Sequence, residues 1–309
     1  MLAAELMRRQ KIDVLGLTFT TPFFTARKAQ AAARHLNLPL VIEDITAEHL
    51  KMLKSPRYGY GRNMNPCIDC HTLMLQIAGK RMEENAYNFL ITGEVLGQRP
   101  MSQNKQSLYV VAKNSGYPDY ILRPLSGKLL EPIKAERDNL IDRSALLSIQ
   151  GRGRKDQIKL AAEFGIKDYA PPAGGCLLTD PMFTRRLRDL FAHQEDHDIH
   201  DLNLLKYGRH FRADDRGKII VGRNNSDNES LRELSTGDDL VLSMADFPGP
   251  LVVIPHGDTA LLPFAASLCV RYSDSPNDLE VEVVCLHKNS SKSIKAKAAA
   301  KEDCEKWII

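Results

Sequence analysis

The chain has 309 residues, of which 43% are apolar and 26% are charged, and its formal net charge is +3. This is the composition of a globular protein that is long enough for two domains. No apolar run reaches the length of a membrane span, no signal peptide precedes the first helix, and six cysteines are too few for a disulfide scaffold. We therefore expect a protein of the reducing cytoplasm with no membrane partner.

The first half of the chain alternates between strand-like and helix-like segments. Strands are expected at residues 12–20, 39–45, 88–91 and 120–122, and helices at residues 27–36, 71–84, 102–114, 144–150 and 155–164. This order predicts an α/β fold with a doubly wound, mainly parallel sheet. Ligand sites in such sheets form at the carboxyl ends of the strands. Residue Cys67 and the segments 92–94 and 123–126 would lie in loops at that edge.

A second, smaller α+β domain with a partly antiparallel sheet is expected from residue 202 onward. Its short strands are predicted at residues 211–214, 218–221, 239–243, 251–255 and 280–286, and its helix at residues 259–272. The predicted division is therefore residues 1–195, residues 202–287 and a basic tail at residues 288–309. Lys288 to Lys301 contains five lysines and no acid. Such a tail is typical of nucleic-acid contact and equally of a solvated terminus.

Three cysteines are candidates for chemistry: Cys67 and Cys70 in a C-x-x-C pattern, and Cys176 after two glycines. Flanking Pro or Gly predicts that each sulfur is presented at a turn or loop. Three thiolates would hold a metal or cluster and leave a fourth position open, as a catalytic site requires. The alternatives are a structural zinc site, with His71 as a further ligand, and a redox disulfide between Cys67 and Cys70. The other cysteines are expected to be incidental, with Cys269 and Cys285 buried and Cys304 exposed.

Two basic clusters are candidates for contact with RNA. In residues 151–155 two glycines allow close backbone approach and the basic side chains supply donors that match phosphates. In the second region Gly and aromatic residues interleave with basic ones, which suits an RNA surface. The first cluster consists of Arg152, Arg154 and Lys155, and the second of Arg209, His210, Arg212 and Arg223. Solvated surface charge is the alternative interpretation of both.

Four motifs occur in a fixed order: residues 65–71 (NPCIDCH), 92–103 (TGEVLGQRPMSQ), 123–126 (RPLS) and 174–180 (GGCLLTD). Together, over roughly residues 1–190, they resemble the PP-loop ATP-pyrophosphatase family of tRNA-thiolating enzymes, the 4-thiouridine synthetase and 2-thiouridylase group. The segments at residues 208–211 and 222–224 resemble the RNA-binding module at the end of NFACT-type ribosome-quality-control proteins.

The resemblance implies an ATP-dependent tRNA uridine sulfurtransferase, which adenylates a uridine carbonyl and then replaces the oxygen with sulfur. ATP with Mg²⁺ would be the cofactor, and tRNA and an unidentified sulfur donor would be the partners. The residues near the nucleotide would be Gly93, Glu94, Gln98 and Arg123. Cys67, Cys70 and Cys176 would be catalytic, either holding a [4Fe–4S] cluster with one open iron or carrying persulfide. Both roles require thiolates and hence a low thiol pKa.

One motif of that family, the phosphate loop Ser-Gly-Gly-x-Asp-Ser after the first strand, does not occur in the sequence. Residues 1–7 resemble the helix that follows this loop. A doubly wound fold would then lack its central strand and leave ladder groups unpaired. We expect either that Met1 is not the functional start or that the chain is a non-catalytic RNA-binding paralog. A zinc-stabilised relative acting on another carbonyl substrate is a third interpretation.

Overall fold

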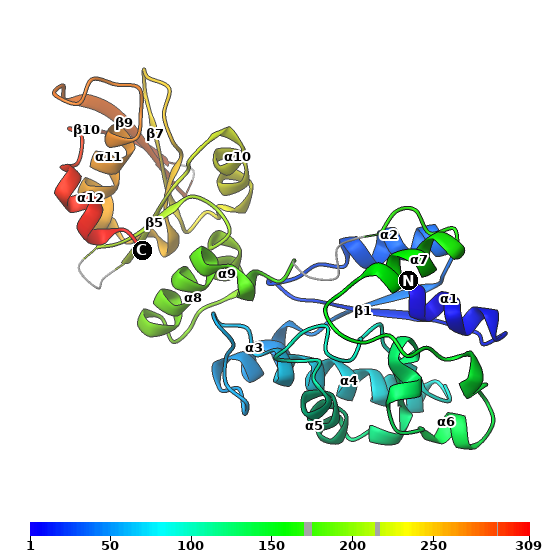
Figure 1. Cartoon of the computed structure of the whole chain (residues 1–309). Helices are drawn as coiled ribbons and strands as arrows, with labels where there is room; N and C mark the ends of the chain where they lie inside the picture. Colours follow the sequence, from blue (N-terminus) through cyan, green and yellow to red (C-terminus); the bar gives the residue numbers. More distant parts are fainter. Residues whose placement is uncertain (170–174, 214–216, 289) are drawn as a thin grey trace. The chain divides into compact units, whose positions relative to one another are not determined.

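The computed structural model describes residues 1–169, 175–213, 217–288 and 290–309, and it divides into two compact units, Met1–Thr179 and Asp180–Ile309 (Figure 1). The boundary lies earlier than residue 195 because α8 (Pro181–His193) belongs to the second unit. Within that helix, Arg186 donates to the carbonyl oxygens of Leu205 and Gly208 at 2.9 and 2.8 Å. These bonds attach α8 to the chain that leads into the second sheet.

The first unit mixes helices and short strands, as expected for an α/β fold. Its strands are β1 (Gly16–Thr20), β2 (Leu40–Asp44), β3 (Leu90–Ile91) and β4 (Ile121–Leu122). Its helices are α1 (Leu2–Arg9), α2 (Arg27–Leu36), α3 (Thr46–Lys54), α4 (Cys67–Glu84), α5 (Lys105–Ser115), α6 (Lys134–Arg137) and α7 (Lys155–Glu163). Strands β1 and β2 pair in parallel, and so do β3 and β4. Among the described residues these pairs are two separate sheets, so one continuous doubly wound sheet is not formed.

The predicted helix at residues 144–150 is wrong. Only a short 3₁₀ turn forms, at Arg143–Ala145, and the chain then runs extended. The backbone N–H groups of Leu147 and Ile149 donate to the carbonyl oxygens of Pro124 and Leu125 at 3.0 and 2.9 Å. Pairing with a distant segment therefore replaces the local helical bonds.

The second unit contains a six-stranded sheet in the order β10-β9-β7-β8-β6-β5, and all of its pairings are antiparallel. The strands are β5 (Arg209–Ala213), β6 (Gly217–Val221), β7 (Leu240–Met244), β8 (Val252–Ile254), β9 (Val281–His287) and β10 (Ser290–Ala296). The helices are α8, α9 (Ile199–Leu204), α10 (Asn225–Leu234), α11 (Leu262–Arg271) and α12 (Lys301–Trp307). Buried side chains of α11, such as Ala265 and Leu268, share one apolar core with the sheet.

The expected basic tail is wrong as a separate part, because residues 290–307 belong to the second unit. Strand β10 pairs with β9 over seven positions, and α12 packs its Cys304 into the apolar core. Cys304 is only 6% exposed, so the prediction of an exposed thiol is also wrong, whereas Cys269 and Cys285 are buried as expected. No helix of the described residues is long and apolar enough to span a membrane.

Candidate functional site

The segments that follow the four strands of the first unit meet at one edge. The rings of Phe23 and Phe24, after β1, lie 5.5 and 5.4 Å from the ring of His49 in α3, the helix that follows β2. Glu94 follows β3 and Arg123 follows β4, and Arg123 Nε donates to Glu94 Oε2 at 2.9 Å. The start of α4 connects the His49 group with the Glu94 group. Cys70 Sγ lies 3.6 Å from His49 Nε2, and His71 Nδ1 lies 3.1 Å from Glu94 Oε1.

Cys67 and Cys70 lie in the first turn of α4 rather than in the loop that the flanking Pro predicts. Pro66 precedes the helix at a position where the missing N–H costs no helical bond. Asn65 Nδ2 donates to Cys67 Sγ at 3.3 Å. Asp69, between the two cysteines, accepts bonds from two backbone N–H groups of the preceding loop. The helix start therefore holds both sulfurs in a defined place.

Cys176 reaches the same region from far along the chain. Gly175 has a φ of +103°, in the left-handed region that favours glycine, and it turns the chain just before the cysteine. Leu177 N donates to Phe23 O at 2.9 Å, and Asn63 Nδ2 donates to Thr179 O at 2.7 Å. These bonds tie the cysteine segment to the loops after β1 and before α4. The other glycine of the predicted motif, Gly174, lies outside the described residues.

The thiols are electrostatically coupled. Burial raises the pKa of Cys70 far above its ordinary value, and the neighbouring Cys176, Cys67 and Asp69 raise it further. Burial also raises the pKa of Cys176, although the backbone N–H of Leu178 opposes it. The structure thus brings the three predicted cysteines together, but burial raises the pKa of Cys70 and of Cys176, whereas we expected a lowered thiol pKa. Among the described residues, no group of three or more His, Cys, Asp or Glu side chains is arranged to hold a metal ion.

Glu94 is a buried carboxylate held between His71 and Arg123. It is 8% exposed, and its Oε1 lies 3.1 Å from His71 Nδ1 while its Oε2 accepts from Arg123. Burial alone would raise the pKa of Glu94, but the hydrogen bond from His71 and the charge of Arg123 outweigh it and hold the pKa at about 2. Arg123 also donates to Leu108 O at 3.3 Å. Glu94 and Arg123 therefore hold the edge of the site together, and neither side chain lines the cavity beside Gly93.

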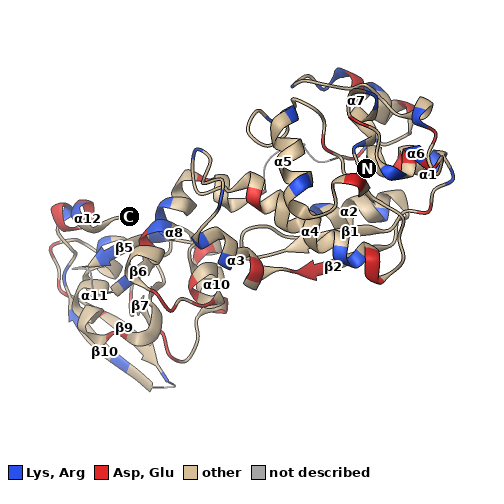
Figure 2. Cartoon of the chain, turned by 90° about the horizontal axis from the view of Figure 1, so that it is seen from below, with Lys and Arg blue, Asp and Glu red and all other residues tan. Residues whose placement is uncertain are grey.

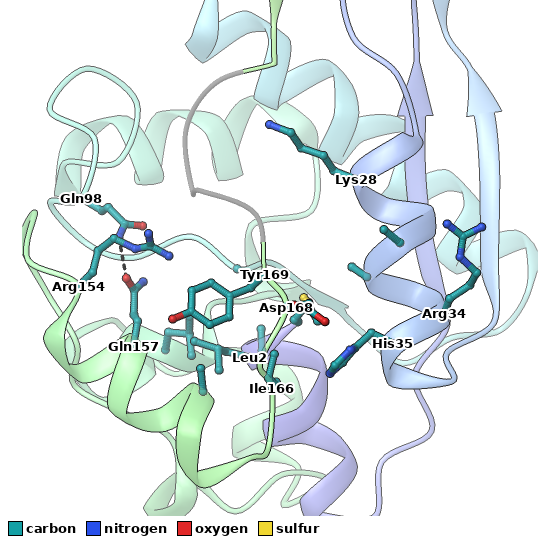
Figure 3. A pocket seen from close by; sticks show the side chains of 17 residues that line it. Leu2, Lys28, Arg34, His35, Gln98, Arg154, Gln157, Ile166, Asp168 and Tyr169 are labelled. Carbon is teal, nitrogen blue, oxygen red and sulfur yellow. Dashed lines mark hydrogen bonds between the residues drawn. The ribbon is translucent and has the colours of Figure 1, made fainter.

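A cavity of about 720 Å³ opens next to Gly93, within the size range of small-molecule sites (Figure 3). Of the residues predicted near a nucleotide, Gly93 and Gln98 line it, and Gln98 Nε2 donates to Gln157 Oε1 at 3.0 Å. The guanidinium of Arg154 lies over the ring of Tyr169 at 5.8 Å, and both face the cavity. Arg154 Nε is buried without a hydrogen-bond partner among the described residues. The further polar lining comes from Lys28, Arg34, His35 and Asp168.

This lining combines cations, amides and one aromatic ring, which suits an anionic ligand with a flat ring. The sequence analysis did not identify most of these lining residues, and it did not identify His49. Lys28, Arg34 and His35 lie in a helix that the sequence predicts, but nothing in an Ala-rich helix marks which face borders a cavity. His49 lies in α3, a helix that the sequence analysis did not identify.

The predicted RNA-binding residues of the second unit fall into two groups. His210 is 1% exposed and hydrogen-bonds to Tyr207 O at 2.8 Å. Arg212 donates two hydrogen bonds to Asp189 of α8, and its side chain is 12% exposed. Both residues therefore join β5 to neighbouring segments, and the structure does not present them at the surface.

Arg209 and Arg223 lie at or near the surface. The guanidinium of Arg209 lies over the ring of Tyr272 at 4.7 Å, and Arg223 is paired with Asp227 with its side chain 44% exposed. Lys292 and Lys295 are exposed on β10, where Figure 2 shows basic residues along the strand. In the other predicted cluster, Arg152 and Lys155 are exposed, whereas Arg154 faces the cavity.

Comparison with known proteins confirms both resemblances. Residues 7–136 match the family model described as "Thiamine biosynthesis protein (ThiI)", and residues 208–308 match "NFACT protein RNA binding domain". The chain is similar to a "Probable tRNA sulfurtransferase" of Methanocaldococcus jannaschii, with 40% identity over 86 residues. That alignment covers 28% of this chain and 20% of the relative, so the chain spans about a fifth of the relative's length.

A solved structure, that of the C-terminal part of the fibronectin/fibrinogen-binding protein from Streptococcus suis, aligns over 92% of this chain and 100% of its own. The identity is 14% and the TM-score is 0.31, so this alignment carries no argument about fold or function.

Proposed function

We propose that this chain takes part in the thiolation of uridine in tRNA, as an ATP-dependent sulfurtransferase. The observation that carries the proposal is the meeting of Cys67, Cys70 and Cys176 at the edge formed by His49 and Glu94. The similarity to the probable tRNA sulfurtransferase and to the two family models supports the same substrate class.

In this proposal the 720 Å³ cavity binds the nucleotide. ATP supplies the activation that turns the uridine oxygen into a leaving group. Gln98 and Gln157, already bonded to each other, offer amide groups to a base, and the unpaired Nε of Arg154 offers a donor to an anion. The carboxylate of Glu94 holds His71 and Arg123 in place behind the cavity.

The thiols would carry the sulfur. Burial lowers the pKa of His49 to about 4, so its imidazole is neutral and can hydrogen-bond to the Cys70 thiol without charge. A cysteine that attacks or carries persulfide sulfur must lose its proton. Burial raises the pKa of Cys70 and of Cys176, so in this proposal the binding of substrate or donor favours the thiolate. The described residues do not show the three-point geometry that an iron–sulfur cluster needs, and we derive no step through a cluster.

The second unit would hold the RNA. A single uridine offers little surface, so an enzyme that modifies it needs phosphate contacts elsewhere on the molecule. Arg209, Arg223, Lys292 and Lys295 are the cationic side chains that the structure leaves at or near the surface of the sheet for this purpose.

A second candidate is a non-catalytic RNA-binding protein. It is favoured by one observation, the lack of the Ser-Gly-Gly-x-Asp-Ser motif in the 309 residues. The two candidates agree on RNA binding and differ on ATP-dependent chemistry.

The test is a single-turnover assay of sulfur incorporation by the full chain, with unmodified tRNA, ATP and a low-molecular-weight thiol persulfide, which transfers its outer sulfur and leaves as a thiol, read on a mercury-containing gel. We expect ATP-dependent retardation of the tRNA that is lost in Cys70→Ser and Cys176→Ser. Cys304→Ala, in the second unit, is the control and should retain the activity. If the folded wild-type chain binds tRNA but gives no ATP-dependent product, the non-catalytic candidate holds.

A further inference from the structure

The loop at residues 55–62, between α3 and α4 of the first unit, exposes two tyrosines among basic side chains. Tyr58 and Tyr60 are each 41% exposed, and Arg57 and Arg62 are exposed as well. The guanidinium of Arg57 lies 5.6 Å from the centre of the Tyr58 ring. The loop therefore gathers cations and ring faces at the surface, outside the lining of the proposed nucleotide cavity.

The hydroxyl groups of both tyrosines are bonded to neighbouring helices. Tyr60 Oη donates to Leu53 O, in the last turn of α3, at 2.6 Å. Tyr58 Oη accepts from Asn114 Nδ2, in the last turn of α5, at 2.8 Å. Each ring is thus held in one direction while much of it stays open to solvent. A ring that is already ordered can stack on a flat partner with little further loss of side-chain entropy.

The backbone of the loop is attached to the start of the helix that carries two of the cysteines. Arg57 N and Tyr58 N donate to the carboxylate of Asp69 at 3.1 and 3.0 Å, and Asp69 lies between Cys67 and Cys70 in α4. Helices α3 and α5 both pack against α4 (Figure 1). The loop therefore crosses the start of α4 between its two tyrosine anchors, and a ligand on the loop would lie beside these cysteines.

The surroundings of the loop carry positive charge without acidic residues. Residues 51–68 contain four Lys or Arg residues and no acid, and residues 95–118, which include α5, contain three and no acid. Lys54 and Lys113 are exposed, and each adjoins in sequence the helix residue that bonds to a tyrosine hydroxyl. Within the described parts of the chain neither lysine forms an ion pair, whereas Arg81, toward the other end of α4, is paired with two glutamates.

This combination of groups fits single-stranded RNA. Unpaired bases offer flat faces that stack on Tyr and Arg side chains, whereas the bases of a duplex are covered by their neighbours. The phosphates of the same strand match cations that lack an acidic partner within the protein. An acidic polypeptide would match the charge but would leave the two fixed rings unused.

We propose that the loop at residues 55–62, together with Lys54 and Lys113, forms a stacking surface for an unpaired segment of the substrate RNA, next to the uridine that is modified. The inference rests on the proposed function for the identity of the substrate. It adds that this uridine lies in a single-stranded segment. Stacking of the flanking bases on the tyrosines would keep the strand open and leave the uridine exposed toward the cysteines.

The test uses the full chain and a short single-stranded RNA that contains 5-iodouridine, which on irradiation attaches to an aromatic side chain stacked against it. Trypsin cuts after Arg57 and Arg62, so both tyrosines lie in one peptide, residues 58–62, and mass spectrometry detects the attachment there. We expect attachment to residues 58–62 with the single strand, and about tenfold less with the same strand annealed to its complement.

Two matched double variants test the charge and leave the tyrosines in place. Lys54→Ala combined with Lys113→Ala should lower the attachment to residues 58–62 about tenfold at about 0.1 M salt, because two phosphate contacts are lost. Lys80→Ala combined with Lys128→Ala removes the same charge from two other exposed positions of the first unit and should leave the attachment unchanged.

Equal attachment of single strand and duplex, or no attachment to residues 58–62 at saturating probe, overturns the proposal. If polyglutamate displaces the probe as well as unlabelled single-stranded RNA does, the surface belongs to an acidic polypeptide and the proposal is also wrong. The thiolation assay separates this inference from the proposed function. Attachment without any thiolated product refutes the sulfurtransferase and not the stacking surface. Thiolation by the Lys54 and Lys113 double variant at an unchanged half-saturating tRNA concentration refutes the stacking surface and not the sulfurtransferase.

Discussion

Replacing Glu94 by Gln should destabilise the first unit by about 3 kcal/mol. Burial alone would raise the pKa of Glu94, yet His71 and Arg123 hold it at about 2, against an ordinary value of 4.5. A difference of about 2.5 units corresponds to about 3 kcal/mol of preference for the charged form in the folded state. Gln keeps the shape but leaves Arg123, with its side chain only 7% exposed, without a counter-charge.

The stability that the ionised Glu94 contributes should decrease in acid. The folded pKa of Glu94 is depressed, so its contribution is fully present above about pH 4.5 and is lost as the pH falls toward about 2. The difference in unfolding free energy between wild type and Glu94→Gln should therefore be largest near neutral pH and should shrink in acid. Urea unfolding followed by far-UV circular dichroism measures this difference. Trp307, the one tryptophan of the chain, lies in the second unit, so its fluorescence follows that unit separately.

Glu43→Gln is the matched control. Glu43 also pairs with an arginine, Arg81, but the side chain of Arg81 is 51% exposed and solvent screens the pair, so this change should cost much less stability than Glu94→Gln. The reasoning about Glu94 fails if both variants lose the same stability, or if the loss in Glu94→Gln does not diminish in acid.

Three further predictions concern the second unit. Asp189→Asn should lower the stability reported by Trp307 fluorescence by about 3 kcal/mol, because it leaves two buried cations unpaired, and an unchanged midpoint would contradict this. Burial lowers the pKa of Lys218 to about 8 from 10.5, so the unfolded chain binds more protons between these values. Wild-type stability should therefore rise with pH across that window, and the rise should be absent in Lys218→Met. Replacing Lys292 and Lys295 by Glu should weaken tRNA binding by about tenfold and reduce its salt dependence. Filter binding at several salt concentrations measures both, and an unchanged affinity would refute the prediction.

The sequence was sufficient for elements with a clear apolar period. Strand β2 and helix α7 lie within one or two residues of their predicted limits. The sequence did not predict α3 and α10, although with 9 and 10 residues they are at least as long as α7 with 9. Their burial depends on what the rest of the fold places beside them. The segment at residues 144–150 shows the reverse error, because its backbone bonds go to a partner more than twenty residues away.

The candidate site was predictable where chemistry depends on residue type and not where it depends on burial. Cysteines near Pro or Gly were identified as one group, and the structure brings them together. Arg209 and Arg212 look alike in sequence, two and five residues after Tyr207, yet Arg212 is hydrogen-bonded to Asp189 and the guanidinium of Arg209 lies over the ring of Tyr272. The partner that decides each role is distant in sequence, so no local pattern separates them.

Strand β3 is only two residues long, yet it positions two parts of the candidate site. Gly93, two residues after it, lines the cavity of about 720 Å³, and Glu94 holds His71. A strand this short has little pairing of its own, so its position depends on the buried hydrogen bond between Glu94 and Arg123, which lies after β4. The loss of that bond in Glu94→Gln should therefore disturb the lining of the cavity as well as the stability of the first unit.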